Sequence, residues 1–158
     1  MRIKGITDED FVNYKLPSMF IATATCSFKC DKEHGSPVCQ NGPLAKQKSV
    51  RVDAADLCHR YMSNRITHAV VFGGLEPFDQ FDDILFMIRY LRVSFCHDDI
   101  VIYTGYNKGE IEDKILLLHE FPNIVIKFGR YIPGHQPHFD PVLGVNLASD
   151  NQYAERIS

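Results

Sequence analysis

The chain has 158 residues, 45% of them hydrophobic and 23% charged, and its formal net charge is −3. This length suffices for a domain that buries its own core without metal or disulfide staples, and the odd number of cysteines, five, argues against a disulfide framework. The sequence shows no signal peptide and no apolar run near the roughly 20 residues of a membrane span, so we expect a cytoplasmic protein that does not bind a membrane. It also has no run of basic residues, so we do not expect it to bind nucleic acid.

The first half of the chain predicts a strand, a cysteine loop, a helix and a second strand. Residues 19–25 are apolar and small, as in a buried strand, and the loop that follows holds three of the five cysteines. Asp53 suits the N-cap of a helix that ends near Asn64, with apolar residues four apart on one face. Residues 68–72 form the second apolar strand, which ends in a pair of glycines.

The second half continues the alternation of strands and helices. Apolar residues at helical spacing predict a helix over 81–93, and residues 100–104 predict a third strand. Another helix is expected over 110–120 and a fourth strand over 124–128. Residues 131–158 are rich in proline, glycine and histidine, and only the segment "VLGVNLAS" within them resembles a strand.

This order of elements predicts a single α/β domain over 1–158, with its core at about 19–152 and a mainly parallel sheet. In such a sheet, ligands bind where the carboxyl ends of the strands open into loops. Four segments fall at that edge: the cysteine loop, Gly73-Gly74, Thr104-Gly105 and Gly129-Arg130. Their convergence on one rim predicts a ligand site.

The cysteine loop offers Cys26, Cys30 and Cys39 within one stretch of polar and turn-forming residues. Thiolates are the usual ligands of zinc and of iron–sulfur clusters, so the pattern indicates a metal site. With His34 as a fourth ligand, the three cysteines would form a tetrahedral zinc clip. Without it, three cysteines would hold a cubane whose fourth iron is open to a small molecule, and the residues alone leave both possibilities open.

The order of motifs resembles the radical S-adenosylmethionine enzymes, and within them the activating proteins of anaerobic ribonucleoside-triphosphate reductases. The resemblance extends over about residues 19–152. It is carried by the cysteine loop, "FGGLEPF" (72–78), "IYTGYN" (102–107), "KFGRY" (127–131) and "LASDNQ" (147–152). Three features depart from the family pattern: eight residues separate Cys30 from Cys39 where two are usual, Val38 replaces an aromatic residue, and Leu75 separates the glycine pair from Glu76.

The resemblance implies an incomplete β/α barrel, with a [4Fe-4S] cluster on Cys26, Cys30 and Cys39 and with S-adenosylmethionine as the second cofactor. The cofactor-binding residues would be Gly73, Gly74, Glu76, Thr104, Gly105, Tyr106 and Lys127, with Arg130 as a further partner for the carboxylate. The residues themselves also allow simpler roles: the glycines suit an ordinary turn, Tyr106 could pack at a helix entry, and Lys127 and Arg130 could be solvated. No side chain is expected to act as a catalytic acid or base, because the cofactors supply the chemistry.

The implied activity is formation of a 5′-deoxyadenosyl radical that installs a glycyl radical on a partner enzyme. That partner would be the large subunit of an anaerobic ribonucleotide reductase, and the electron would come from a low-potential donor such as flavodoxin or ferredoxin. Two alternatives stay open: a non-enzymatic interaction domain stabilised by zinc on Cys26, Cys30, His34 and Cys39, and a radical S-adenosylmethionine enzyme that acts on another substrate.

Overall fold

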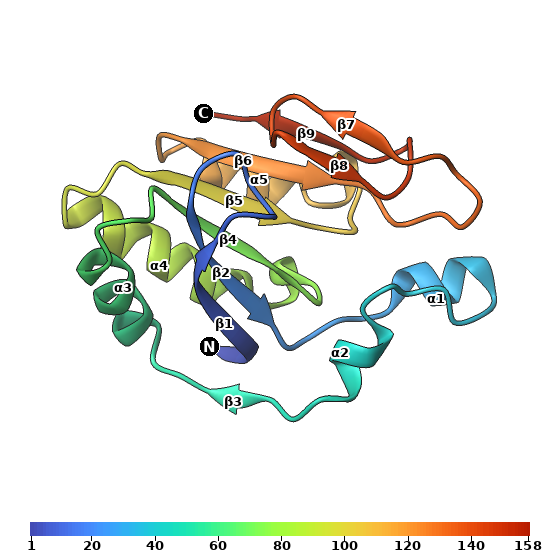
Figure 1. Ribbon diagram of the computed structural model, residues 1–158, viewed down its shortest axis with the longest axis horizontal. Helices are drawn as coiled ribbons and strands as arrows, with labels where there is room; N and C mark the ends of the chain where they lie inside the picture. Colours follow the sequence, from blue (N-terminus) through green and yellow to red (C-terminus); the bar gives the residue numbers. More distant parts are fainter.

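A computed structural model describes all of residues 1–158, and its main feature is a seven-stranded sheet with the order β3-β1-β2-β4-β5-β6-β9 (Figure 1). The strands are β1 Arg2–Asp10, β2 Ser18–Thr23, β3 Val50–Arg51, β4 Ala69–Gly74, β5 Asp99–Tyr103, β6 Ile124–Phe128 and β9 Tyr153–Arg156. A separate hairpin pairs β7 His138–Asp140 with β8 Val145–Leu147. The helices are α1 Lys29–His34, α2 Gly42–Lys46, α3 Ala54–Ser63, α4 Phe81–Val93 and α5 Glu112–Leu118, with 3-10 turns η1 Pro77–Gln80 and η2 Lys108–Glu110.

The four central strands, β2, β4, β5 and β6, are parallel, as the sequence predicts. Antiparallel strands flank them, β1 beside β2 and β9 beside β6, and the sheet stays open at both edges. The fold is therefore an α/β fold with a mainly parallel mixed sheet. It is not a closed barrel and is consistent with the expected partial one.

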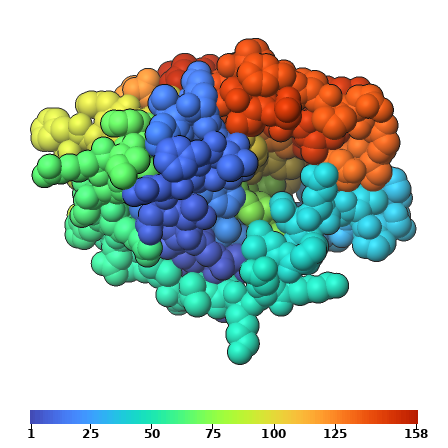
Figure 2. All heavy atoms as spheres, in the orientation of Figure 1, coloured from blue at the N-terminus to red at the C-terminus, as the bar shows by residue number.

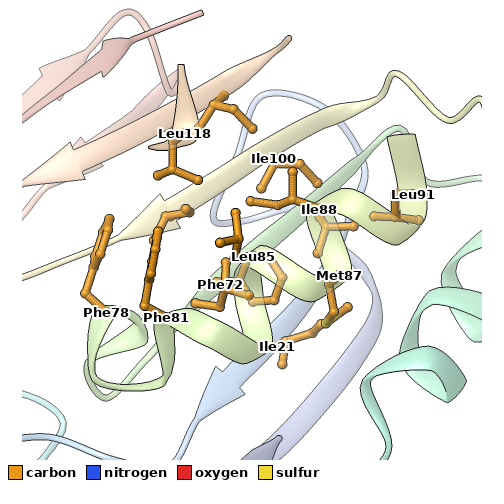
Figure 3. Close-up of a cluster of buried hydrophobic side chains, with 14 of the residues drawn as sticks. Ile21, Phe72, Phe78, Phe81, Leu85, Met87, Ile88, Leu91, Ile100 and Leu118 are labelled. Carbon is orange, nitrogen blue, oxygen red and sulfur yellow. The ribbon is translucent and has the colours of Figure 1, made fainter. Parts of the chain in front are cut away.

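Both faces of the central strands are buried, which explains their nearly continuous apolar sequences. Successive residues alternate between the faces: Val70 and Phe72 of β4 belong to the larger core, whereas Ala69 and Val71 belong to a smaller one. The larger core lies between the sheet and the helices, where side chains of α4 such as Ile88 meet those of the strands (Figure 3). The smaller core lies under the β7–β8 hairpin and the loop between β1 and β2 that contains Tyr14.

The structure contains the helices that the N-cap residue and the apolar spacing predict near 53–64 and 81–93. Asp53 accepts a hydrogen bond from the backbone N–H of Ala55 at 2.8 Å, as an N-cap does, and α3 ends at Ser63. The bounds of α4 are those predicted, and Ile84 and Leu91 at its helical spacing are fully buried. None of the helices combines the length and the apolar character needed to cross a membrane.

Other elements differ from the expectation. The helix predicted over 110–120 is divided into η2 and α5, because a capping box joins Asn107 to Glu110 and closes a separate turn first. The cysteine loop contains the short helices α1 and α2, which bury no residue. The segment "VLGVNLAS" does contain a strand, β8, while β1, β3, β7 and β9 were not predicted.

Candidate metal and cofactor site

A cavity of about 470 Å³ opens at the carboxyl edge of the parallel strands. Figure 2 shows the hollow between the segment of α1 and α2 and the C-terminal segment, with atoms from the middle of the chain at its bottom. Every residue that the resemblance nominates as a cluster or cofactor ligand lines this cavity: Cys26, Cys30, Cys39, Gly73, Gly74, Glu76, Thr104, Gly105, Tyr106 and Lys127. The predicted convergence on one rim is therefore present in the fold.

The three cysteines reach the cavity from the segment that follows β2. All three are free thiols and are partly exposed. Burial raises the pKa of Cys26 to about 11, and burial together with the neighbouring Cys39 thiol raises the pKa of Cys30. The Cys26 and Cys30 side chains are therefore protonated at neutral pH in the absence of metal, and metal binding must release their protons.

His34, the fourth ligand of the zinc alternative, does not join the three thiols. It is exposed at the end of α1, its Nδ1 lies 2.8 Å from the hydroxyl of Ser36, and it lines a second, smaller cavity that Cys26 and Cys39 do not reach. No set of three or more His, Cys, Asp or Glu side chains has the geometry to hold a single metal ion. The Cys₃His zinc set is thus not preassembled.

The glycine pair ends β4 and lies in close contact with β2. Gly74 has φ of +80°, and a Cβ there would lie 2.9 Å from the Cα of Ala22. A Cβ on Gly73 would lie 2.8 Å from the ring of Phe20. Gly74 is therefore required by the packing of neighbouring strands and by its φ, whereas the Phe20 ring could turn away from a Cβ on Gly73. Both glycines line the cavity.

Glu76 is a buried carboxylate in the wall of the cavity, not a solvated side chain, with an exposed fraction of 6%. Its Oε1 accepts hydrogen bonds from the backbone N–H of Phe78 at 3.1 Å and the hydroxyl of Thr104 at 2.8 Å, and its Oε2 accepts one from the N–H of Gly105 at 2.9 Å. Burial raises the pKa of Glu76 to about 7, although these hydrogen bonds oppose the shift. Oε2 keeps a second lone pair without a protein donor.

Lys127 is also buried, with an exposed fraction of 7%, so the sequence alternative of a solvated strand end is wrong for it. Its Nζ donates a hydrogen bond to the carbonyl of Gly129 at 2.8 Å and forms no ion pair with a carboxylate. Burial lowers the pKa of Lys127 to about 8, while the charge of Glu76 opposes this shift. The cavity wall thus contains a cation with little compensation from the protein.

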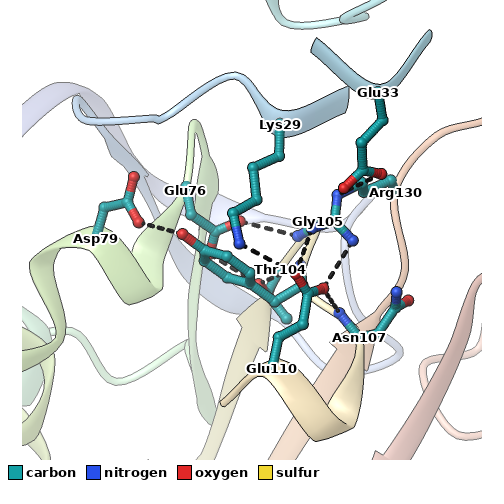
Figure 4. Close-up of polar contacts among 10 residues, drawn as sticks. Lys29, Glu33, Glu76, Asp79, Thr104, Gly105, Asn107, Glu110 and Arg130 are labelled. Atoms are coloured by element: carbon teal, nitrogen blue, oxygen red, sulfur yellow. Dashed lines mark hydrogen bonds and ion pairs between the residues drawn. The ribbon is translucent and has the colours of Figure 1, made fainter. Parts of the chain in front are cut away.

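Arg130 takes part in a polar network that joins α1 to the sheet edge (Figure 4), and Tyr106 contacts residues of the same network. The guanidinium of Arg130 pairs with Glu110 at 2.6 Å and with Glu33 of α1 at 3.2 Å, so its charge is already balanced within the protein. The hydroxyl of Tyr106 donates to Asp79 at 2.7 Å, and the ammonium of Lys29 lies 4.6 Å from its ring centroid. One face of the Tyr106 ring is therefore already in contact with a cation.

Comparison with known proteins shows the family to which the chain belongs. A family model described as "4Fe-4S single cluster domain" matches residues 18–138, which is more than half of the chain. The chain belongs to this family. No curated protein and no solved structure matches it.

Membership of the 4Fe-4S single cluster domain family agrees with the donors in the cavity. Thiolates are the protein ligands of such clusters, and three free thiols, those of Cys26, Cys30 and Cys39, line this one cavity. The donor set therefore fits a [4Fe-4S] cluster, and the matched region begins at the first residue of β2 and includes all three cysteines.

Three residues of the site were not predicted: Asp31, Asn41 and Glu110. Asp31 accepts hydrogen bonds from two backbone N–H groups near Cys39, and Asn41 donates to the carbonyl of Gly74. Glu110 pairs with both Lys29 and Arg130. Each acts through partners seven or more residues away, and no local pattern marks such partners in one sequence.

Proposed function

We propose that the chain is a radical S-adenosylmethionine activase, which binds a [4Fe-4S] cluster through Cys26, Cys30 and Cys39. One observation carries the proposal: the three cysteines share a cavity with the glycine pair, Glu76 and Lys127. Family membership supports the cluster, and the order of the motifs supports S-adenosylmethionine as its partner. A cavity of about 470 Å³ has the size of a cofactor site.

The chemistry supplied by a bound, reduced cluster would be transfer of one electron to the sulfonium, which breaks the S–C5′ bond and yields methionine and a 5′-deoxyadenosyl radical. That radical would take a hydrogen atom from a glycine Cα of the partner, leaving 5′-deoxyadenosine and a glycyl radical. The balance needs one electron from a flavodoxin or ferredoxin and no proton transfer by a side chain of this chain.

The residues of the cavity would bind and orient the amino-acid part of S-adenosylmethionine. The free lone pair of Glu76 Oε2 can accept a hydrogen bond from the α-ammonium group. The Lys127 ammonium, which donates only to the carbonyl of Gly129, can pair with the α-carboxylate. Opposite charges on one wall suit a zwitterion, and burial strengthens both contacts.

The partner we propose is the large subunit of an anaerobic ribonucleotide reductase. The motifs "FGGLEPF", "IYTGYN" and "KFGRY" occur in the order found in the activating proteins of these reductases. The segments that follow β2, β4, β5 and β6 all line the cofactor cavity, and a partner protein would supply the surface that presents the glycine.

The test is anaerobic reconstitution with iron and sulfide, followed by assay of S-adenosylmethionine cleavage with dithionite. We expect about four irons and four sulfides per chain and equal amounts of 5′-deoxyadenosine and methionine. Cys39→Ser should lose both the cluster and the products. Cys96→Ser, which alters a cysteine outside the cavity, should keep them. A fully loaded cluster that forms neither product would contradict the proposal, and one zinc without sulfide would favour the interaction domain.

The partner is tested separately by electron paramagnetic resonance. Mixing the loaded protein, S-adenosylmethionine and an anaerobic ribonucleotide reductase should produce a glycyl radical doublet, which a glycine-to-alanine change in the reductase removes. Cleavage of S-adenosylmethionine without this doublet would instead favour a radical enzyme that acts on another substrate.

A further inference from the structure

The segment between Cys30 and Cys39 has little packing to hold it in place. Residues 32–37 are all exposed, and α1 buries none of its residues. A loop of this kind loses more conformational entropy when its ends are brought together than a shorter one does. Because Cys30 and Cys39 nevertheless line the same cavity, something other than apolar burial must hold Cys39 there.

The side chain of Asp31 provides that restraint. Its Oδ1 accepts hydrogen bonds from the backbone N–H groups of Val38 and Cys39, both at 2.8 Å. Asp31 follows Cys30 directly in the chain, so these two bonds tie the backbone of one cysteine to the neighbour of the other. Hydrogen bonds to an ionised carboxylate are stronger than those between neutral groups.

The helix α1, which carries Asp31, is joined to the body of the protein by ion pairs of its other side chains. Gly35, with φ of +75°, ends α1, and its N–H donates to the carbonyl of Asp31 at 2.9 Å. On either side of Asp31, Lys29 pairs with Glu110 at 3.1 Å and Glu33 pairs with Arg130 at 3.2 Å. The carboxylate therefore extends from an anchored helix toward the Cys39 backbone.

We propose that Asp31 is the positioning residue that makes Cys39 available as a cluster ligand, by closing the eight-residue gap through its two backbone hydrogen bonds. The inference rests on the proposed function in one respect, the use of Cys39 as an iron ligand. Asp31 itself touches neither iron nor substrate. Both bonds end on the same oxygen, so an asparagine, which keeps one carbonyl oxygen, can replace it.

The experiment compares wild type, Asp31→Ala, Asp31→Asn and Lys32→Ala. Lys32 is the matched control, because it is exposed on the same helix and its side chain makes no hydrogen bond or ion pair. Hydrogen exchange on the metal-free proteins reports the restraint itself: the amides of Val38 and Cys39 should exchange fastest in Asp31→Ala, with the amides of the central strands unchanged. Iron release from the reconstituted proteins to a ferrous chelator reports the consequence.

We expect iron release from Asp31→Ala to be about 10- to 100-fold faster than from wild type, the usual effect of losing a residue that orients a metal ligand. Lys32→Ala should behave like wild type, and Asp31→Asn, which keeps an acceptor oxygen but loses the charge, should release iron more slowly than Asp31→Ala. Unchanged exchange or unchanged iron release in Asp31→Ala would overturn the proposal, and so would an Asp31→Asn protein as labile as Asp31→Ala. None of these measurements uses S-adenosylmethionine. A protein that keeps its iron but forms no 5′-deoxyadenosine would therefore contradict the proposed function and leave the role of Asp31 unaffected.

Discussion

The carboxylate of Glu110 and the guanidinium of Arg130 are joined by two hydrogen bonds, of 2.7 Å from Nη1 to Oε2 and 2.6 Å from Nη2 to Oε1. The Arg130 side chain is only 9% exposed, so this pair is shielded from water more than most surface ion pairs. Glu110 also pairs with Lys29 of α1. The pair therefore links the cysteine-bearing helix to the carboxyl edge of the sheet.

Glu110→Gln should lower the free energy of unfolding by about 1–3 kcal/mol at pH 7, because Lys29 and Arg130 both lose a charged partner and Arg130 keeps only Glu33. Urea unfolding measures the change. The hydrogen bond from Arg130 lowers the pKa of Glu110 to about 2, so the stabilisation is lost as the pH falls from 4.5 through 2. The two proteins should thus converge in acid. Glu120→Gln, which alters an exposed glutamate just beyond the end of α5, should match wild type at both pH values.

The elements that the sequence predicts well are those whose burial is periodic. The helix α4 has the predicted bounds because Ile84, Ile88 and Leu91 repeat on the face that enters the core. The strand β6 is likewise an uninterrupted buried run. In contrast, β1 has the sequence RIKGITDED, of which only Ile3 and Asp10 are buried, so its place beside β2 depends on backbone pairing. Such pairing leaves no periodic signal.

The residues of the site likewise fall into those that the sequence reveals and those that it does not. Cys26, Cys30 and Cys39 could be found because thiols in one loop are chemically distinctive, and the glycines because they interrupt the apolar pattern at strand ends. The partners of Arg130 could not, since nothing in the sequence pairs residue 130 with residues 33 and 110. The predicted role of Arg130 as a carboxylate ligand overlooked these two glutamates, which already neutralise its charge.

Glu76 should make the stability of the protein depend on pH in the neutral range. Burial raises its pKa from 4.5 to about 7, so the native state binds the proton more tightly than the unfolded state does. The resulting stabilisation is complete below pH 4.5 and is lost as the pH rises through 7. Relative to Glu76→Gln, which does not titrate, wild type should lose up to about 3 kcal/mol of unfolding free energy across this interval.

The measurement is the free energy of unfolding at several pH values from 4.5 to 8 for wild type, Glu76→Gln and the exposed-site control Glu120→Gln. The control should follow wild type. Parallel curves for wild type and Glu76→Gln would mean that the Glu76 carboxylate is ionised throughout, and the expected shift of its pKa would be wrong.

Gly74 and Gly109 form a matched pair for the packing argument at the sheet edge. Gly74→Ala places a Cβ 2.9 Å from the backbone of Ala22 and forces alanine to a φ of +80°, whereas a Cβ on Gly109 meets nothing within 4 Å. We expect Gly74→Ala to destabilise the protein by about 2 kcal/mol or more and Gly109→Ala to change its stability by less than about 0.5 kcal/mol. Urea unfolding of both variants checks this, and equal effects would show that the approach of β4 to β2 can relax.

Lys127 should show opposite effects on stability and on cofactor binding. Burial lowers its pKa from 10.5 to about 8, so the ammonium destabilises the native state at pH 7, and this penalty is relieved as the pH rises from 8 to 10.5. Lys127→Met removes the buried charge together with one hydrogen bond, to Gly129. The net result at pH 7 should be a gain of about 1–2 kcal/mol in the free energy of unfolding.

The same substitution should weaken S-adenosylmethionine binding about 10- to 100-fold, because a charge-assisted contact with the carboxylate is lost. Anaerobic calorimetry on the reconstituted protein measures this affinity. Lys114→Met is the control: Lys114 also donates to a backbone carbonyl, that of Phe78 at 3.0 Å, but lies outside the cavity, so its loss should leave the affinity unchanged. A Lys127→Met protein that is less stable and binds as tightly as wild type would make Lys127 a structural residue, whose ammonium serves only the Gly129 carbonyl.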